Sequence, residues 1–233
     1  MDLGLTGKRA LVTGASKGIG LAITSALVAE GAHVVAGSRS VSDGLRELIG
    51  GGQVRQVSVD LSTADGPAEL VASALEDGPL DVLVNNVGAV TPRLDGFLSV
   101  TDDQWLQSLT LGFMAAVRTT RAALPSMLEA SQGTIINTCS VNAFLPDPAV
   151  IDYSAAKAAL ANFSKALSKE VGPHGIRVNT SAPARSRPDS GSEIAASLPR
   201  SRRRRASIQR PWPSTRPRRP RPDASPSPSR SPT

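Results

Sequence analysis

The chain has 233 residues, of which 40% are hydrophobic, and a single cysteine, Cys139. This length is enough for one substantial core, and a single cysteine excludes a disulfide-stabilised scaffold. No apolar run approaches the roughly 18 residues that a membrane-spanning helix needs, so we expect no membrane segment. The first residues show no basic stretch followed by an apolar one, so we expect no signal peptide and a cytoplasmic location.

The net charge of +6 is unevenly distributed along the chain. Residues 181–233 contain 13 arginines, no lysine and three acids, whereas residues 1–180 contain 13 basic and 17 acidic residues. The basic segment also holds 11 of the 18 prolines. Such a composition buries too little apolar surface to offset the entropy lost on ordering. We therefore expect a folded domain over 1–180 and a disordered basic tail, rich in Arg, Pro and Ser, over 181–233.

Residues 1–180 alternate short apolar runs with longer amphipathic ones. The apolar runs predict strands over 9–13, 33–37, 54–59, 81–84, 134–139 and 176–180. The amphipathic segments predict helices over 18–30, about 65–76, about 102–130 and about 150–171. Strands that are apolar on both faces and alternate with helices indicate an α/β fold with a doubly wound parallel sheet. Ligands bind such sheets at the carboxyl ends of the strands.

A glycine-rich segment follows the first predicted strand. Thr13–Gly20 reads T-G-A-S-K-G-I-G, and its glycines would let backbone N–H groups approach a pyrophosphate at the helix N-terminus. After the second strand come Ser38 and Arg39, without the acid that would bind a free ribose 2′-hydroxyl. Arg39 and Lys17 suit a 2′-phosphate, which favours NADP(H) over NAD(H). The alternative is that both are solvated surface cations.

A tyrosine and a lysine follow the fifth predicted strand. Tyr153 lies 13 residues beyond Ser140, and Lys157 follows it at i+4. Residues four apart share a helix face, so the Lys157 ammonium can lie beside the Tyr153 hydroxyl and favour its ionised form. Tyr153 is also the only tyrosine in the chain. A tyrosine and a lysine at this spacing are common on surface helices, but their position opposite a dinucleotide loop predicts an acid/base pair.

Taken together, these segments resemble the short-chain dehydrogenase/reductase family, and within it the 3-oxoacyl-ACP reductases. Thr13–Gly20 is similar to the family's T-G-x-x-x-G-x-G loop, residues 85–88 to its N-N-A-G segment, and residues 153–157 to its Y-x-x-x-K pair. Ser140 falls at the position of the catalytic serine, and the match covers residues 5–180 in order and spacing. The resemblance implies a Rossmann-type fold, hydride transfer between NADP(H) and a carbonyl or secondary alcohol on a small molecule, and a homo-oligomer.

The resemblance also implies a role for each matching residue. Tyr153 would pass a proton to or from the substrate oxygen, Ser140 would hydrogen-bond that oxygen, and Lys157 would also bind the nicotinamide ribose. Asp60 would contact the adenine, and Asn86 would line the adenosine side. The expected cofactor-binding residues are Gly14, Ser16, Lys17, Gly18, Ile19, Gly20, Ser38, Arg39, Asp60, Leu61, Asn86, Gly88, Tyr153 and Lys157. No metal site is expected, because His33 and His174 lie far apart without other ligands nearby.

The sequence departs from the family in two places. Gly112 stands where the family has an Asn that helps hold a proton-relay water, so either a water substitutes or the relay is impaired. After Thr180 the family's P-G motif, substrate-covering segment and seventh strand are not recognisable, so we expect the sheet to lack its last strand. A hypothetical coding string for V-S-P-G-P-V-A-T-G-L-G, read one base later, yields the residues from Ser181 to Gly191. We therefore expect a frameshift here.

These departures leave two alternatives to an active enzyme. One is a remnant that is inactive or only binds the cofactor. The other is nucleic-acid binding through the basic tail, because arginines release counterions from phosphates. The tail lacks interleaved aromatic residues and any recognisable binding motif, so we expect no nucleic-acid partner.

Overall fold

A computed structural model describes residues 3–183 of the chain. Six strands form one sheet: β1 (Arg9–Thr13), β2 (His33–Ser38), β3 (Val54–Ser58), β4 (Val82–Asn85), β5 (Gly133–Thr138) and β6 (Ile176–Ser181). Their order is β3-β2-β1-β4-β5-β6, and every neighbouring pair is parallel. The predicted doubly wound α/β fold is confirmed. Within residues 3–183, β6 is an edge strand and no seventh strand follows it.

In the described part of the chain, six α-helices connect and cover these strands: α1 (Gly18–Ala29), α2 (Asp43–Gly50), α3 (Gly66–Leu75), α4 (Asp102–Leu109), α5 (Ala115–Glu129) and α6 (Ile151–Val171). α2 was not predicted from the sequence. Its start is marked by Ser42, whose hydroxyl accepts a hydrogen bond from the backbone N–H of Leu45. Leu45, Leu48 and Ile49 then pack on one face of the sheet, so the helical spacing was present in the sequence.

The predicted single helix over 102–130 is wrong in its middle. α4 and α5 are joined by a π-helical turn, Thr110–Met114, that contains the buried Gly112. Such turns add one residue to a helical turn and are frequent at functional sites. A Cβ at Gly112 would lie 3.2 Å from the Cβ of Ala156 in α6. The glycine therefore allows a close approach of the two helices.

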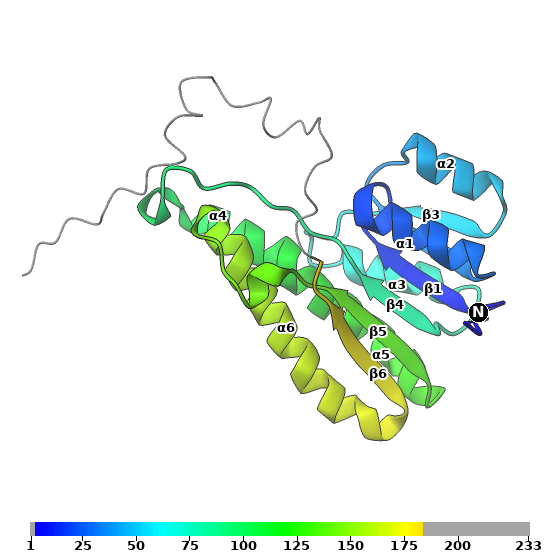
Figure 1. Ribbon diagram of the computed structural model, residues 1–233. Coiled ribbons are helices and arrows are strands. Elements are labelled where there is room, and N and C mark those ends of the chain that lie inside the picture. Colours follow the sequence, from blue (N-terminus) through cyan, green and yellow to red (C-terminus); the bar gives the residue numbers. More distant parts are fainter. Residues whose placement is uncertain (1–2, 184–233) are drawn as a thin grey trace, which may run out of the picture. The chain divides into compact units, whose positions relative to one another are not determined.

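The helices form separate layers on the two faces of the sheet. α1 and α2 pack on a cluster that contains Val12, Val34 and Val84, whereas α3, α5 and α6 pack on a second cluster that contains Leu11 and Ile135. Figure 1 shows α6 running beside β5 and β6, with α1 and α2 beside the β1–β3 half of the sheet. Strands buried on both faces account for the continuous apolar runs of the sequence.

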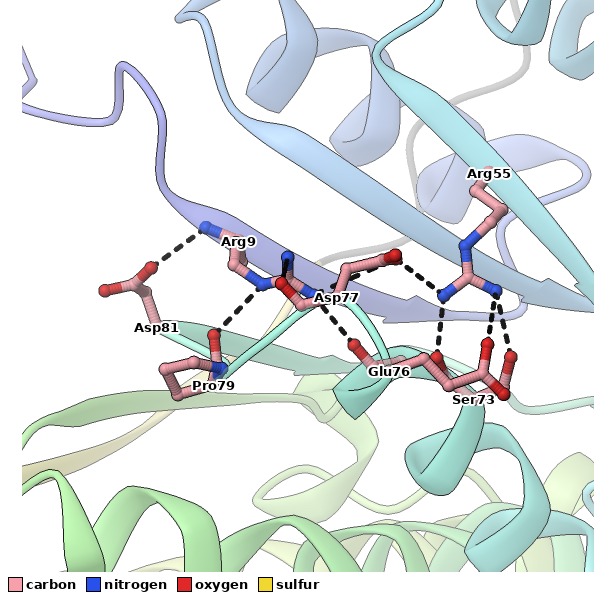
Figure 2. Close-up of polar contacts among 8 residues, drawn as sticks. Arg9, Arg55, Ser73, Glu76, Asp77, Pro79 and Asp81 are labelled. Atoms are coloured by element: carbon pink, nitrogen blue, oxygen red, sulfur yellow. Dashed lines mark hydrogen bonds and ion pairs between the residues drawn. The ribbon is translucent and has the colours of Figure 1, made fainter.

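The amino ends of the strands are held by a network of arginines (Figure 2). Arg9 donates to the carbonyl oxygens of Ala74 at 2.9 Å and Pro79 at 3.1 Å, and also to that of Asp77. Arg55 donates to the carbonyl oxygen of Ser73 at 2.7 Å and to the carboxylate of Asp77 at 2.9 Å. The network therefore fixes the end of α3 and the turn that leads into β4.

Most of the predicted tail, 181–233, lies outside the described residues. Of this segment the structure describes only Ser181, which ends β6, and residues 182–183. The expected disorder, the frameshift and the absence of a nucleic-acid partner therefore stay predictions from the sequence.

Candidate active site

The glycine loop lies between β1 and α1, beside the point where the sheet order reverses. Gly14 and Gly18 have positive φ angles of 68° and 56°, which favour glycine. A Cβ at Gly20 would overlap the carbonyl oxygen of Gly14 and lie 2.5 Å from the side-chain nitrogen of Asn86. The loop therefore needs glycine at these positions for its own packing and backbone conformation.

The start of α1 is free to receive an anion. Lys17 occupies the N-cap position without a side-chain capping bond, and the first turn contains no acid. The first N–H groups of a helix have no partner within the helix and carry partial positive charge. Ser16 is half-buried, whereas Lys17, Gly18 and Ile19 are exposed. This loop fits a pyrophosphate, which is the group that a dinucleotide would present.

Side chains at the ends of β2 and β3 flank the glycine loop. Ser38 is buried and its hydroxyl donates to the carbonyl of Ser40 at 2.8 Å, whereas Arg39 is exposed. Asp60 is also exposed, and Leu61 beside it is buried. Hydrogen bonds from the backbone and hydroxyl of Ser62 lower the pKa of Asp60, with a smaller contribution from the charge of Arg39. A cation and a carboxylate therefore face solvent at this edge.

The residues after β4 tie this strand to β1. The side-chain amide of Asn86 donates to the carbonyl oxygens of Thr13 at 3.0 Å and Gly14 at 3.3 Å. The hydroxyl of Thr13 accepts from the backbone N–H of Asn86 at 2.9 Å and of Val87 at 3.1 Å. Asn86 therefore holds the glycine loop in place, a role that the sequence analysis did not assign to it.

A buried amide network, also missed from the sequence, lies behind these loops. The side chain of Asn85 donates to Thr120 at 3.0 Å and to Asn137 at 2.9 Å, and Asn137 donates to Ser164 at 2.7 Å. These residues come from β4, α5, β5 and α6. The network links the ends of β4 and β5 to α5 and α6. The signal for this network in the sequence is an asparagine in each of two strands, Asn85 and Asn137, which the structure pairs at the same register.

Lys157 is the centre of the predicted acid/base group. Its Nζ is buried and donates to the carbonyl oxygen of Thr138 at 2.7 Å, at the end of β5. The same Nζ lies 5.9 Å from the centroid of the Tyr153 ring. A Cβ at Gly88 would lie 3.5 Å from it. Lys157 thus connects the end of β5, the segment after β4 and Tyr153.

Ser140 follows β5 two residues beyond the carbonyl that Lys157 binds. It is buried, and its hydroxyl accepts a hydrogen bond from the backbone N–H of Asn142 at 3.2 Å. The hydroxyl proton is therefore free for another acceptor. Tyr153 is half-buried in the first turn of α6. The arrangement can supply a hydroxyl donor, a phenol and an ammonium at one edge of the sheet.

Burial acts on the two titratable groups behind this edge. It lowers the pKa of Lys157, although the charge of Cys139 opposes the shift. It raises the pKa of the Cys139 thiol, and the Lys157 ammonium counteracts this only in part. A buried thiol of raised pKa is a poor nucleophile, so Cys139 acts as a small buried core residue.

A buried ion pair next to Tyr153 was not found from the sequence. Arg93, in the segment after β4, donates to one carboxylate oxygen of Asp152 through Nε at 3.0 Å and Nη2 at 2.6 Å. Ser108 of α4 donates to the same oxygen at 2.7 Å. Burial alone would raise the pKa of Asp152, but the hydrogen bonds outweigh it, so the pKa is lowered. Asp152 is therefore a carboxylate at neutral pH.

Cavities elsewhere do not compete with this site. One of about 320 Å³ lies at the amino ends of β1–β3 and is lined by residues that include Arg9, Arg55 and Asp77. The guanidinium groups there already bind the protein's own carbonyls and carboxylates. Across residues 3–183 no cluster of three or more His, Cys, Asp or Glu side chains could hold a metal. No helix in that range is long and apolar enough to cross a membrane.

Comparison with known proteins places this architecture in a family. The family model for short chain dehydrogenases matches residues 8–197. The chain is 37% identical over 186 residues to the uncharacterized oxidoreductase YvrD of Bacillus subtilis, which covers 78% of this chain and 70% of that protein. It is 37% identical over 183 residues to the 3-oxoacyl-[acyl-carrier-protein] reductase FabG of Salmonella typhimurium, with 76% and 72% covered.

A solved structure agrees with these sequence matches. A 3-oxoacyl-(acyl-carrier-protein) reductase of Agrobacterium tumefaciens, solved with NADP bound, superposes with a TM-score of 0.74 at 29% identity. The superposition covers 82% of this chain and 75% of that one. With the parallel sheet, the glycine loop and the tyrosine–lysine pair on one edge, these matches show that the chain belongs to the short-chain dehydrogenase/reductase family of oxidoreductases.

Proposed function

We propose that the chain is an NADP(H)-dependent oxidoreductase that interconverts a carbonyl and a secondary alcohol, with Tyr153 as the acid/base. The observation that carries the proposal is the position of Lys157. Its buried Nζ is held 2.7 Å from the Thr138 carbonyl oxygen and 5.9 Å from the Tyr153 ring centroid, at the edge that carries the glycine loop. A buried ammonium requires a compensating partner, and a developing phenolate provides one.

The residues at the site divide the chemistry between them. The chemistry that a bound NADPH would supply is a hydride for the carbonyl carbon. Tyr153 donates the proton to the carbonyl oxygen, and the hydroxyl of Ser140 donates a hydrogen bond to the same oxygen as charge develops there. Lys157 stabilises the resulting phenolate and binds the nicotinamide ribose. In the oxidative direction the same groups act in reverse.

The proposed cofactor-binding residues lie in the glycine loop and at the ends of the neighbouring strands. Gly14, Ser16, Gly18, Ile19 and Gly20 form the loop and the first turn of α1, where the free N–H groups suit the pyrophosphate. Ser38, Asp60, Leu61, Asn86 and Gly88 complete the site at the ends of β2, β3 and β4.

Two exposed cations support NADP(H) over NAD(H). Arg39 and Lys17 both face solvent at this edge, and no acid follows β2 at the place where a ribose 2′-hydroxyl would need an acceptor. A 2′-phosphate would accept hydrogen bonds from the Arg39 guanidinium. The related reductase that was solved with NADP bound supports the same choice.

One observation favours a second candidate, a protein that binds the cofactor without turnover. Gly112 offers no side chain to the proton relay. A Cβ at this position would lie 3.2 Å from the Cβ of Ala156. A water would have to take the place of the missing side chain. Cofactor binding does not depend on this position, so the two candidates differ only in turnover.

The test is binding of NADPH and of NADH to the full chain, followed by fluorescence, together with carbonyl reduction by wild-type protein and a Tyr153→Phe variant. The substrate panel takes a 3-oxoacyl thioester, a ketose and an aryl ketone. We expect tighter binding of NADPH, and turnover that falls about 10²–10⁴-fold in the variant. Binding without turnover on any of the panel would support the second candidate, and absence of binding would reject both.

A further inference from the structure

The first turn of α6 carries Tyr153. The helix begins at Ile151, directly after the 3₁₀ turn Pro148–Val150, whose N-cap Asp147 accepts a hydrogen bond from the backbone N–H of Ala149 at 2.9 Å. That cap serves the 3₁₀ turn, and Val150, the residue just before α6, has no side chain that could cap the helix itself. Since Tyr153 is the third residue of the helix, its placement depends on the other contacts that hold this turn.

Those contacts converge on the residue before Tyr153. One carboxylate oxygen of Asp152 accepts from Arg93 at 2.6 and 3.0 Å and from Ser108 at 2.7 Å. The backbone N–H of Arg93 also donates to the carbonyl oxygen of Ala149 at 2.6 Å, just ahead of the helix. The segment after β4, helix α4 and the start of α6 therefore meet at one carboxylate.

Burial distinguishes this ion pair from the others in the described part of the chain. The side chains of Asp152 and Arg93 are 1% and 9% exposed, whereas every other ion pair between residues 3 and 183 has at least one partner more than 35% exposed. Taking two charges out of water is costly, and apolar residues of equal volume often stabilise a fold at least as much as a buried ion pair does. The Nε and Nη2 groups of Arg93 do, however, form a fork on one oxygen of Asp152, and Ser108 donates to the same oxygen, so this oxygen is held from two sides.

We propose that Arg93 and Asp152, supported by Ser108, are positioning residues that hold the first turn of α6 and so direct the Tyr153 hydroxyl toward the substrate oxygen. The inference rests on the proposed function for its kinetic consequence, because the ion pair acts through Tyr153. Loosening the pair lets the phenol occupy positions in which proton transfer is slow. The rate of the chemical step falls while binding of the cofactor is kept.

The test uses the fact that Tyr153 is the only tyrosine in the chain. Protein that contains 3-fluorotyrosine gives one ¹⁹F resonance, which reports the surroundings of this ring without any turnover. The variants are Arg93→Lys, which keeps the charge and loses the fork, and Asp152→Asn, which keeps the shape and loses the charge. The matched control is Arg55→Lys, whose guanidinium also binds a carboxylate and a serine but at the opposite edge.

We expect both variants to shift or broaden the Tyr153 resonance, in the full chain with and without NADPH. We also expect kcat to fall about tenfold with KM within about twofold, because the geometry is changed and the binding contacts are not. The control should change neither the resonance nor kcat. In the double variant the loss in kcat should be no larger than in either single one, because the two residues act as a unit.

Ser108→Ala provides a milder variant if either ion-pair variant does not fold, since it removes one hydrogen bond from Asp152. A Tyr153 resonance that is unchanged in all variants overturns the proposal, and so does an equal fall in kcat for Arg55→Lys. If the wild-type chain shows no turnover, the proposed function fails but the resonance still decides this inference.

Discussion

The amino and carboxyl ends of the parallel strands (the amino edge and the carboxyl edge of the sheet) both carry basic side chains, but these side chains differ in their partners. At the amino edge, Arg9 and Arg55 donate hydrogen bonds to carbonyl and carboxylate groups of the chain itself. At the carboxyl edge, Arg39 and Lys17 face solvent, and the first turn of α1 lacks a side-chain cap. Donors that are hydrogen-bonded within the chain stabilise the fold, whereas donors that face solvent can bind a ligand. The location of a cavity alone does not distinguish the two.

The largest expected effect on cofactor binding comes from the glycine loop. In Gly20→Ala the new Cβ would overlap the Gly14 carbonyl oxygen, so the loop must move away from the pyrophosphate position. We expect NADPH affinity to fall at least about 100-fold, because backbone N–H groups must approach the phosphates closely. Fluorescence titration measures the loss. Gly50→Ala at the end of α2 is the control, since a Cβ there meets nothing within 4 Å, and unchanged affinity in Gly20→Ala would contradict the assignment.

Breaking the amino edge should cost stability and leave the chemistry intact. Arg9→Met removes the donors to the carbonyls of Ala74, Asp77 and Pro79. Hydrogen bonds from a charged group contribute about 1.5–3 kcal/mol, and the partial exposure of Arg9 puts the expected loss near 2 kcal/mol in the free energy of unfolding. Urea denaturation measures it, with kcat per folded molecule as the control. A fall in kcat would show that the two edges are coupled.

Cofactor preference should depend on the exposed cation at the carboxyl edge. Arg39→Ala removes a guanidinium that would bind the 2′-phosphate, so we expect NADPH to bind about tenfold more weakly, with NADH unaffected. The matched control is Arg46→Ala, because Arg46 is an exposed arginine of α2 that pairs with Asp43. If both cofactors lose affinity equally, Arg39 does not read the phosphate.

Acid should weaken both edges, but only one of them should affect turnover. Burial would raise the pKa of Asp81, yet hydrogen bonds from Lys8 and the backbone of Arg9 outweigh it and lower the pKa. A carboxyl whose pKa is lowered on folding stabilises the protein above its unfolded pKa near 3.9, and this stability is lost as pH falls through the folded value.

We therefore expect Asp81→Asn and Asp152→Asn to have a free energy of unfolding that changes less between pH 5 and pH 3 than in wild type. Urea denaturation at several pH values measures this. Only Asp152→Asn should also lower kcat. A wild-type slope in both variants would show that neither carboxyl has a lowered pKa in the folded chain.

The sequence predicted the sheet and the glycine loop because both depend on local signals. Continuous apolar runs marked the strands, and glycine spacing marked the turn after β1. The buried contacts could not be predicted in the same way. Arg93 and Asp152 are 59 residues apart, and nothing in either neighbourhood indicates that the two side chains meet. The π turn was missed because periodicity over 102–130 shows a helix without showing one extra residue in it.

That extra residue sets the register between two surfaces that have different partners. α4 faces α6, where Ser108 reaches Asp152, and α5 faces the sheet and α3, where Ala123 and Met127 are buried. A helix turns by about 100° per residue, so deleting Gly112 would rotate one of these faces away from its partner. A single deletion inside this continuous helical segment would therefore move either Ser108 away from Asp152 or Ala123 and Met127 away from the core.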